Sequence, residues 1–239
     1  MKMTIFNGSP HAENGNTHCM VESFSKGAIQ AGAHVENVFL AQKEIHPCRG
    51  CFACWIKTPG QCVIQDDMAE LIEKFTRSDV VVFATPLYVD NVTGIMKNFM
   101  DRIIPIADPH FDKDEGGECV HQSRYENTPK LVVISNCGFP EQSHFQVLEL
   151  LFKRIARNLR THVIGEIYRA GGALLKDAPL ILKPLVHKYK TLLQTAGREI
   201  VERQQLSDEI KSKLHEPLVS ADRYIAGANE HFDKLLSTL

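Results

Sequence analysis

The stretch Met3-Thr4-Ile5-Phe6-Asn7-Gly8-Ser9-Pro10, with Gly15-Asn16-Thr17 shortly after it, decides how the chain begins to fold. A short apolar run leads into the loop, and Met20, Phe24 and Ala28 then recur at the spacing of one helix face. The segment therefore predicts a strand, a loop and a helix in succession. Glycine permits close backbone approach, and the first N–H groups of a helix have no helical partner, so this loop can hold an anion.

The loop favours a single terminal phosphate over the phosphate chain of a nucleotide. Ser9, Asn16 and Thr17 place polar side chains beside the helix N-terminus. A P-loop, G-x4-G-K-[ST], would need lysine where Asn16 stands, and the dinucleotide pattern G-x-G-x-x-G is missing from the segment. For this loop taken alone, an ordinary capped helix after a turn is the alternative.

Short apolar runs then alternate with amphipathic helices, as expected for a parallel sheet with helices on both faces. Val80–Ala84 and Leu131–Ile134 are almost wholly apolar, which predicts central strands. Asp67-Met68-Ala69-Glu70 has the spacing of a capping box and predicts a helix start. The predicted fold class is α/β, a doubly wound five-stranded parallel sheet. Its strands are expected near Met3–Asn7, His34–Leu40, Asp79–Thr85, Lys130–Asn136 and Thr161–Tyr168.

Two segments fall outside this alternation. Ile106–Asn127 predicts a long surface excursion before the fourth strand, and loops of this length are often functional. From Ala178 onward the chain loses strand character, and Ser220–Leu239 predicts a last amphipathic helix. We therefore divide the chain into a domain over residues 1–177 and a helical extension over residues 178–239. The extension is expected to pack on that domain or on a neighbouring subunit.

Composition and charge narrow the class of protein. The 239 residues, 44% of them hydrophobic, can bury one good core. A net charge of −2 creates no global field that favours nucleic acid or an anionic membrane, so small-molecule partners fit better. No apolar stretch approaches the roughly 18 residues of a membrane span, and Met1-Lys2-Met3 opens directly into the first strand. We expect a cytoplasmic protein without nucleic-acid or membrane partners.

Four of the seven cysteines form the pattern Cys48-x2-Cys51-x2-Cys54-x7-Cys62. Structural disulfides are not expected in a reducing compartment, and the odd count leaves one thiol unpaired. The first three have the spacing with which one loop presents thiolates to a cubane iron–sulfur cluster, and Cys62 is available as the fourth ligand. Zinc held by the same thiolates, and unligated thiols that pack as small apolar side chains, are the alternatives.

Two more loops follow predicted strands, at the sheet edge where doubly wound folds bind ligands. They are Thr85-Pro86-Leu87-Tyr88, with Asn91 just beyond, and Asn136-Cys137-Gly138-Phe139. Their small, polar and aromatic residues can hold a flat heteroaromatic ring between backbone amides and an aromatic face. With the first loop, they predict a ligand that has a phosphate at one end and a ring at the other.

These motifs resemble, in order, those of the flavodoxin-like NAD(P)H-dependent FMN reductases, including the branch related to iron–sulfur flavoproteins. The resemblance covers roughly residues 1–170. It is carried by Gly8-Ser9-Pro10 with Gly15-Asn16-Thr17, Cys48–Trp55 with Thr58-Pro59-Gly60 and Asp66-Asp67-Met68, Thr85–Tyr88, Met96–Arg102 and Asn136–Pro140. It implies a flavodoxin-like sheet, FMN as cofactor, NAD(P)H as co-substrate, and a homodimer or homotetramer.

The resemblance also implies a role for each matching residue. The FMN phosphate would be held by Ser9, His11, Asn16 and Thr17. The ribityl chain and isoalloxazine ring would be bordered by Thr85, Pro86, Leu87 and Tyr88. Asn91 would present its backbone N–H towards flavin N5. The pyrimidine side, where donors stabilise the charge of reduced flavin, would be lined by Asn136, Cys137, Gly138 and Phe139.

The function that follows is an FMN-dependent oxidoreductase that takes hydride from NAD(P)H and passes electrons to a quinone, flavin or other small acceptor. Such chemistry requires no acid–base side chain, so no catalytic residue is named. We expect Ile106–Asn127 to shape the acceptor pocket or a subunit interface. The alternative is an iron–sulfur flavoprotein or flavodoxin-like electron carrier with a [4Fe-4S] cluster on the four cysteines, although the small net charge offers little steering towards a protein partner. A third hypothesis, a regulatory module whose thiols sense metal or oxidant, predicts no bound chromophore.

Overall fold

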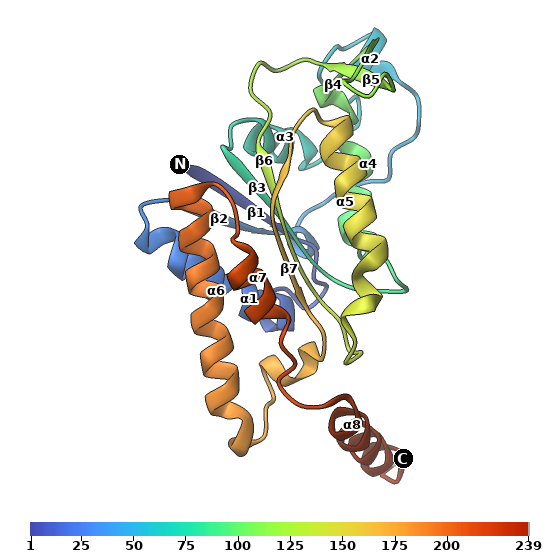
Figure 1. Cartoon of the computed structure of the whole chain (residues 1–239). Helices are drawn as coiled ribbons and strands as arrows, with labels where there is room; N and C mark the ends of the chain where they lie inside the picture. The colour runs from blue at the N-terminus through green and yellow to red at the C-terminus, as the bar shows by residue number, and fades with distance from the viewer. Residues whose placement is uncertain (239) are drawn as a thin grey trace.

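In the computed structural model, which describes residues 1–238, five parallel strands form one sheet in the order β2-β1-β3-β6-β7 (Figure 1). Counting the parallel strands alone, this is the 2-1-3-4-5 order of flavodoxin-like folds. The five predicted strands are confirmed, with ends that shift by at most two residues. They are β1 (Lys2–Asn7), β2 (His34–Phe39), β3 (Val80–Pro86), β6 (Lys130–Asn136) and β7 (Val163–Arg169).

Helices cover both faces of this sheet and bury a separate apolar core on each. Alternate residues of β3 serve the two cores: Val80 and Val82 point to one face, and Val81 and Phe83 to the other. The first face is covered by α1 (Asn16–Gln30), α6 (Lys183–Arg203) and α7 (Asp208–His215), and the second by α3 (Met68–Thr76), α4 (Gly94–Arg102) and α5 (Gln146–Asn158). The short helices are α2 (Ala53–Ile56), η1 (Ala12–Asn14), η2 (Leu40–Gln42), η3 (Ile104–Ile106), η4 (Gln142–Phe145), η5 (Gly172–Leu175) and η6 (Leu180–Leu182).

Helix α6 packs so closely on α1 that two glycines are needed at the contact. A Cβ at Gly27 of α1 would overlap the carbonyl oxygen of Gln194, and one at Gly197 of α6 would overlap that of Phe24. The first helix of the C-terminal extension therefore shares a core with the sheet.

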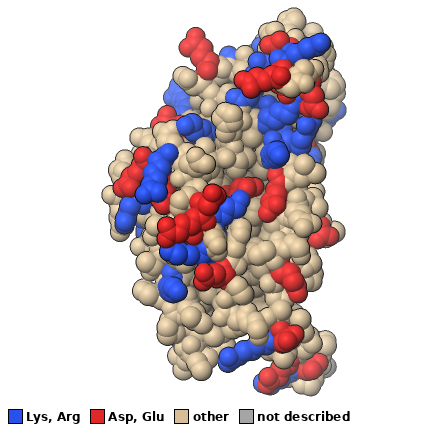
Figure 2. Space-filling view, viewed as in Figure 1, with Lys and Arg blue, Asp and Glu red and all other residues tan. Residues whose placement is uncertain are grey.

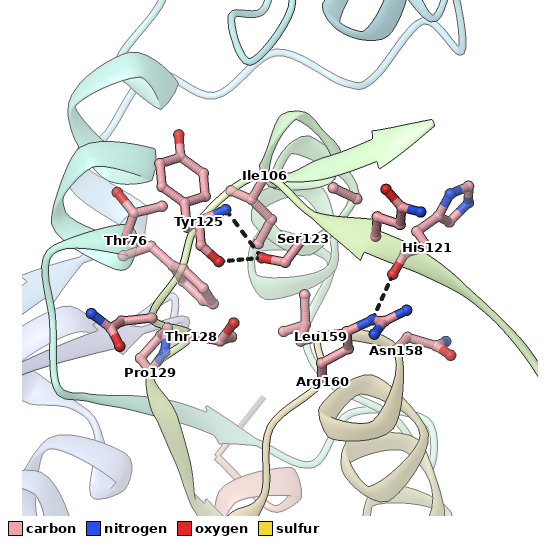
Figure 3. A pocket seen from close by; sticks show the side chains of 14 residues that line it. Thr76, Ile106, His121, Ser123, Tyr125, Thr128, Pro129, Asn158, Leu159 and Arg160 are labelled. Carbon is pink, nitrogen blue, oxygen red and sulfur yellow. Dashed lines mark hydrogen bonds between the residues drawn. The ribbon is translucent and has the colours of Figure 1, made fainter. Parts of the chain in front are cut away.

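The excursion before β6 forms an antiparallel pair that the sequence did not predict, β4 (Ala107–Lys113) and β5 (Cys119–Ser123). Arg157 of α5 holds the turn of this pair against α5 through ion pairs to Asp114 at 2.7 Å and to Glu118 at 3.0 Å. A pocket with room for about one water lies beside this pair, and Tyr125 and Arg160 are among the residues that line it (Figure 3). This pair leaves α4 and leads into the start of β6, so it lies at the amino edge of the sheet. That this segment shapes the acceptor pocket or a subunit interface stays a prediction.

The chain ends in α8 (Ala221–Leu236), which projects from the lower end of the molecule in Figure 1. Ser220 caps this helix by accepting a hydrogen bond from the Arg223 N–H. The last residue of the predicted helix, Leu239, lies outside the described residues. Within residues 1–238, no helix combines the length and the apolar character that a bilayer span requires.

Candidate functional site

The loop after β1 closes on itself around Ser9, which is 2% exposed. The Asn7 side chain accepts from the Ser9 N–H at 3.1 Å, and Ser9 Oγ accepts from the His11 N–H at 3.3 Å. A Cβ at Gly15 would lie 2.5 Å from Ser9 Oγ, so this fold of the loop requires glycine there. His11 is exposed at the rim.

Helix α1 starts at Asn16, directly behind this loop, and its first N–H groups have no helical acceptor. Asn16 Oδ1 is buried and unpartnered within the described chain. Thr17 Oγ1 accepts from Asn136 Nδ2 at 2.7 Å, which leaves the Thr17 hydroxyl hydrogen free to donate. Lys176, from beyond η5, donates to the Asn14 carbonyl oxygen at 3.0 Å and brings a cation to the loop. The cradle therefore offers the donors and the positive charge that a phosphate group requires.

Hydrogen bonds join the three predicted loops at the carboxyl edge of the sheet. The Thr93 hydroxyl donates to the Gly8 carbonyl at 2.7 Å, and the Thr93 N–H donates to Thr85 Oγ1 at 3.2 Å. The Leu87 N–H donates to the Asn136 carbonyl at 2.8 Å. Since Asn136 also binds Thr17, the phosphate-type loop and both ring-type loops form one connected surface.

Tyr88 and Asn91 pair across a tight turn at the tip of the second loop. The turn residues Val89 and Asp90 have φ of 49° and 57°, in the left-handed region that β-branched side chains rarely adopt. The Asn91 N–H, predicted to face flavin N5, donates instead to the Tyr88 carbonyl at 3.1 Å. Among the described residues, the N–H groups of Val89 and Asp90 form no hydrogen bond, so they are the free donors of this turn.

The third loop is held from behind by the chain that follows β7. Gly171 N–H donates to the Phe139 carbonyl at 2.7 Å, and Gly172 N–H to the Cys137 carbonyl at 2.8 Å. Asn136 and Cys137 are buried, whereas Gly138 and Phe139 are exposed. Burial raises the pKa of the Cys137 thiol, so this group stays protonated at neutral pH. Phe139 stacks on His144 with ring centroids 4.2 Å apart, which fixes an aromatic face towards solvent.

All four motif cysteines line one cavity of about 70 Å³, which lies at the other end of α4 from these loops. Cys54 is buried, Cys62 is half-buried, and Cys48 and Cys51 are exposed. The pKa of Cys54 is raised by burial and by the negative charge that the neighbouring thiolates would carry. Within residues 1–238, no three His, Cys, Asp or Glu side chains already stand in metal-binding arrangement. The loop gathers the thiols but does not set them as ligands.

A buried ion pair closes the base of this cysteine loop. Arg102 and Asp66, with side chains 1% and 0% exposed, pair at 2.7 Å and 2.9 Å. Arg102 also donates to the His46 carbonyl and, at 3.5 Å, to Cys62 Sγ. Burial would raise the pKa of Asp66, but hydrogen bonds from Arg102 and from the backbone N–H groups of His46 and Met68 outweigh it and lower the pKa. The pair therefore joins both ends of the loop to α4.

This arrangement corrects the predicted capping box. Asp67 occupies the N-cap position of α3, yet its side chain makes no cap hydrogen bond and accepts from the Glu44 N–H at 2.8 Å. Asp66 accepts from the Met68 N–H at 3.1 Å in its place. The competing partner at Glu44 is remote in sequence, which the local spacing could not show.

The two candidate sites lie at opposite ends of α4. Thr93, at its N-terminal end, belongs to the joined loops, and Arg102, at its C-terminal end, belongs to the cysteine cavity. Nine helical residues separate them by about 13 Å along the axis. Sequence reasoning missed Thr93, although a threonine directly before the first residue of a helix is a common N-cap. It also missed Lys176, for which no local signal exists.

The sheet order and the joined loops define a flavodoxin-like α/β protein with a cradle for a phosphate-bearing ligand. The model of the NADPH-dependent FMN reductase family matches residues 1–173, and the chain belongs to this family. An iron–sulfur flavoprotein of Archaeoglobus fulgidus is 41% identical over 143 residues, which make up 59% of this chain and 58% of that relative. The chain thus spans less than two thirds of that relative's length.

Two solved structures share the fold. An FMN-dependent NADH-azoreductase from Bacillus anthracis, in complex with FMN, aligns with a TM-score of 0.60 at 18% identity and covers 85% of this chain and 98% of its own. An NAD(P)H:quinone oxidoreductase from Methanothermobacter marburgensis aligns with a TM-score of 0.59 at 18% identity, over 84% of this chain and 96% of its own. Because both sequence identities are low, these structural similarities support a shared fold and nothing further.

Proposed function

We propose that this chain is an FMN-dependent oxidoreductase that takes hydride from NAD(P)H and passes electrons to a quinone, flavin or other small acceptor. The observation that carries the proposal is the hydrogen-bonded junction of Thr17, Asn136 and Leu87, which joins a phosphate-type loop to two ring-type loops. Family membership and the family resemblance support it. We further propose that it acts in the cytoplasm as a homodimer or homotetramer.

Each part of the junction has a distinct binding task. The hydroxyls of Ser9 and Thr17, with the first N–H groups of α1, bind the phosphate, and Lys176 offsets its charge. Val89 and Asp90 present free backbone N–H groups to the edge of the ring. Bound FMN supplies the hydride and electron chemistry. The protein's residues bind and orient, and none has to transfer a proton.

The predicted roles of single residues remain proposals. Ser9, Asn16 and Thr17 stand where a phosphate would bind, whereas His11 lies at the exposed rim. Tyr88 and Phe139, 46% and 55% exposed, can cover a flat ring, which supports the bordering role proposed for Tyr88 and the lining of the pyrimidine side proposed for Phe139. The free N–H groups of Val89 and Asp90 replace that of Asn91 as the donors we assign to the ring.

The test compares FMN with riboflavin, which lacks the phosphate, in fluorescence titrations of the full chain. We expect FMN to bind at least about a hundredfold more tightly, since several charge-assisted hydrogen bonds serve the phosphate alone. Thr17→Val should reduce this preference, and Thr191→Val, on the exposed side of α6, should not. Anaerobic NADPH should then bleach the flavin band. Equal affinity for both flavins, or no binding of either, would overturn the proposal.

A second candidate function follows from the cavity that the four thiols share. We propose that Cys48, Cys51, Cys54 and Cys62 hold a [4Fe-4S] cluster, because four thiolates from one loop are the donor set of such clusters. Arg102, which donates to Cys62 Sγ, would then also donate to a ligating sulfur. Zinc and unligated thiols are the outcomes against which this is tested.

Iron, zinc and acid-labile sulfide are measured on anaerobically purified protein. Stoichiometric iron and sulfide that disappear in Cys54→Ser but persist in Cys119→Ser would support the cluster, since Cys119 lies on β5 outside the motif. Zinc without sulfide, or neither metal after reconstitution with iron and sulfide, would refute it. The flavin titration is independent of this result.

A further inference from the structure

Helix α8 leaves most of its apolar side uncovered. None of its 16 residues is buried, and Phe232 and Leu236 are 60% and 68% exposed. The apolar residues recur every three or four positions, along one face of the helix. This stripe consists of Tyr224, Ile225, Ala228, Phe232, Leu235 and Leu236. Since isolated helices of this length are marginal in water, an amphipathic helix gains its stability from whatever covers that face.

The start of α8 is fixed to the body of the molecule. The Tyr224 ring packs over Gly171, where a Cβ would lie 3.3 Å from it. The segment that leads into α8 is held as well, because buried Arg169 of β7 donates to the carbonyl oxygens of Leu214 and Glu216 at the end of α7. The helix axis then leads away from the body, as Figure 1 shows. Anchored in this way, the stripe is presented outward beyond the edge of its own chain.

A second uncovered apolar surface lies at the same end of the molecule. Leu180 and Ile181 are 80% and 72% exposed, and Leu185, at the start of α6, is 43% exposed. We call these three residues the η6 patch. In Figure 2, the lower end of the molecule is largely uncharged apart from charged side chains on α8. The η6 patch and the stripe are thus two apolar surfaces that one copy of the chain leaves open.

Charge distinguishes the two surfaces and makes them complementary. Residues 180–190, around the η6 patch, carry three lysines and no acidic residue. Helix α8 carries three acidic residues and two basic residues, and so a net charge of −1; Lys234 pairs with Glu230 at 2.6 Å. A basic surface favours an acidic helix of the same chain over a second basic surface.

We propose that α8 is an exchanged arm, whose apolar stripe packs on the η6 patch of a second copy of this chain while the second copy's arm does the same in return. Two-fold symmetry makes the contact reciprocal, so each partner contributes one stripe and one patch. Each helix is about 24 Å long. A stable dimer needs about 800 Å² of buried surface from each partner, and the reciprocal contact doubles the area that a single stripe and patch supply. The inference does not depend on flavin or cluster chemistry.

Light scattering coupled to size exclusion measures the mass of the full chain and of matched variants. The arm variant Phe232→Asp/Leu235→Asp and the patch variant Ile181→Asp should each raise the dimer dissociation constant at least about thirtyfold and halve the mass. Ala226→Asp adds a charge on the opposite face of α8 and should leave the mass unchanged. Circular dichroism of each variant confirms that the fold is retained.

Mixing separates an exchanged arm from any other interface. An equimolar mixture of arm and patch variants retains one intact stripe and one intact patch, which fit each other in a mixed dimer. Recovery of dimer in the mixture, from two proteins that are monomeric alone, is the result that reciprocal exchange predicts. A monomeric wild type, an arm variant of unchanged mass, no recovery on mixing, or a monomer that binds anionic phospholipid vesicles through α8 would each overturn the proposal.

Discussion

Replacing Asp66 with asparagine tests whether the buried ion pair holds the cysteine loop in place. The side chain keeps its size, but Arg102 becomes a buried cation without a counter-ion, and both side chains are at most 1% exposed. Removing one partner of such a pair costs about 3–5 kcal/mol, against a total stability of about 5–15 kcal/mol. For a chain of this length, we expect the melting temperature to fall by roughly 6–20 °C.

The assay uses the single tryptophan of the chain. Trp55 lies in the cysteine loop and donates from its indole N–H to the Ile104 carbonyl at 3.2 Å, so its fluorescence reports on the loop. Urea unfolding is followed by this fluorescence and by circular dichroism, which reports on the whole chain. The matched control is Asp101→Asn, because Asp101 is half-exposed and pairs with Lys97 on the surface of α4; it should cost less than about 1 kcal/mol.

Two results would refute this reasoning. If Asp66→Asn costs no more than Asp101→Asn, the buried pair does not stabilise the loop. If Arg102→Met restores none of the stability lost in Asp66→Asn, the unpaired charge of Arg102 is not the cause of the loss.

Three other predictions concern distant parts of the chain. Gly15→Ala should weaken FMN binding at least about tenfold in fluorescence titration, because its Cβ would press on Ser9 Oγ; unchanged affinity would mean that the loop does not close around the ligand. Gly27→Ala should destabilise the chain by about 1–3 kcal/mol in urea unfolding, as its methyl group meets the Gln194 carbonyl; a neutral effect would contradict the tight α1–α6 contact. Burial lowers the pKa of His215, so the unfolded chain takes up a proton at this residue more readily than the folded chain does. The free energy of unfolding should therefore decrease as the pH falls below about 6.5. His215→Gln should flatten this dependence of the melting temperature on pH, and an unaltered dependence would assign it to another group.

Within one chain, α4 stands between the joined loops and the cysteine cavity. An exchanged arm would bring a second copy to the carboxyl edge, where Tyr224 already lies over Gly171. In the proposed dimer, α8 would therefore couple assembly to the environment of the joined loops.

The strands and the loops of the carboxyl edge could be predicted because their signals are local. Apolar runs such as Val80–Ala84 mark buried parallel strands, and Gly8-Ser9-Pro10 marks the turn that follows one. A parallel sheet brings all its carboxyl ends to one edge, so the order of elements was enough to place the three loops side by side. The β4–β5 pair was missed because its residues alternate weakly and four of the seven in β4 are exposed.

Tertiary structure alone decided which distant groups meet. Asp66 precedes the helix start predicted at Asp67, but its partner Arg102 lies 36 residues away, and only the packing of α4 brings the two charges together. Lys176 reaches the first loop from 162 residues away. The five-stranded sheet, its main helices and the chemistry of each loop follow from the sequence, because the periodicity of apolar residues and the turn residues act over a few positions. Contacts between loops depend on how helices pack over the sheet, and no short stretch of sequence contains that information.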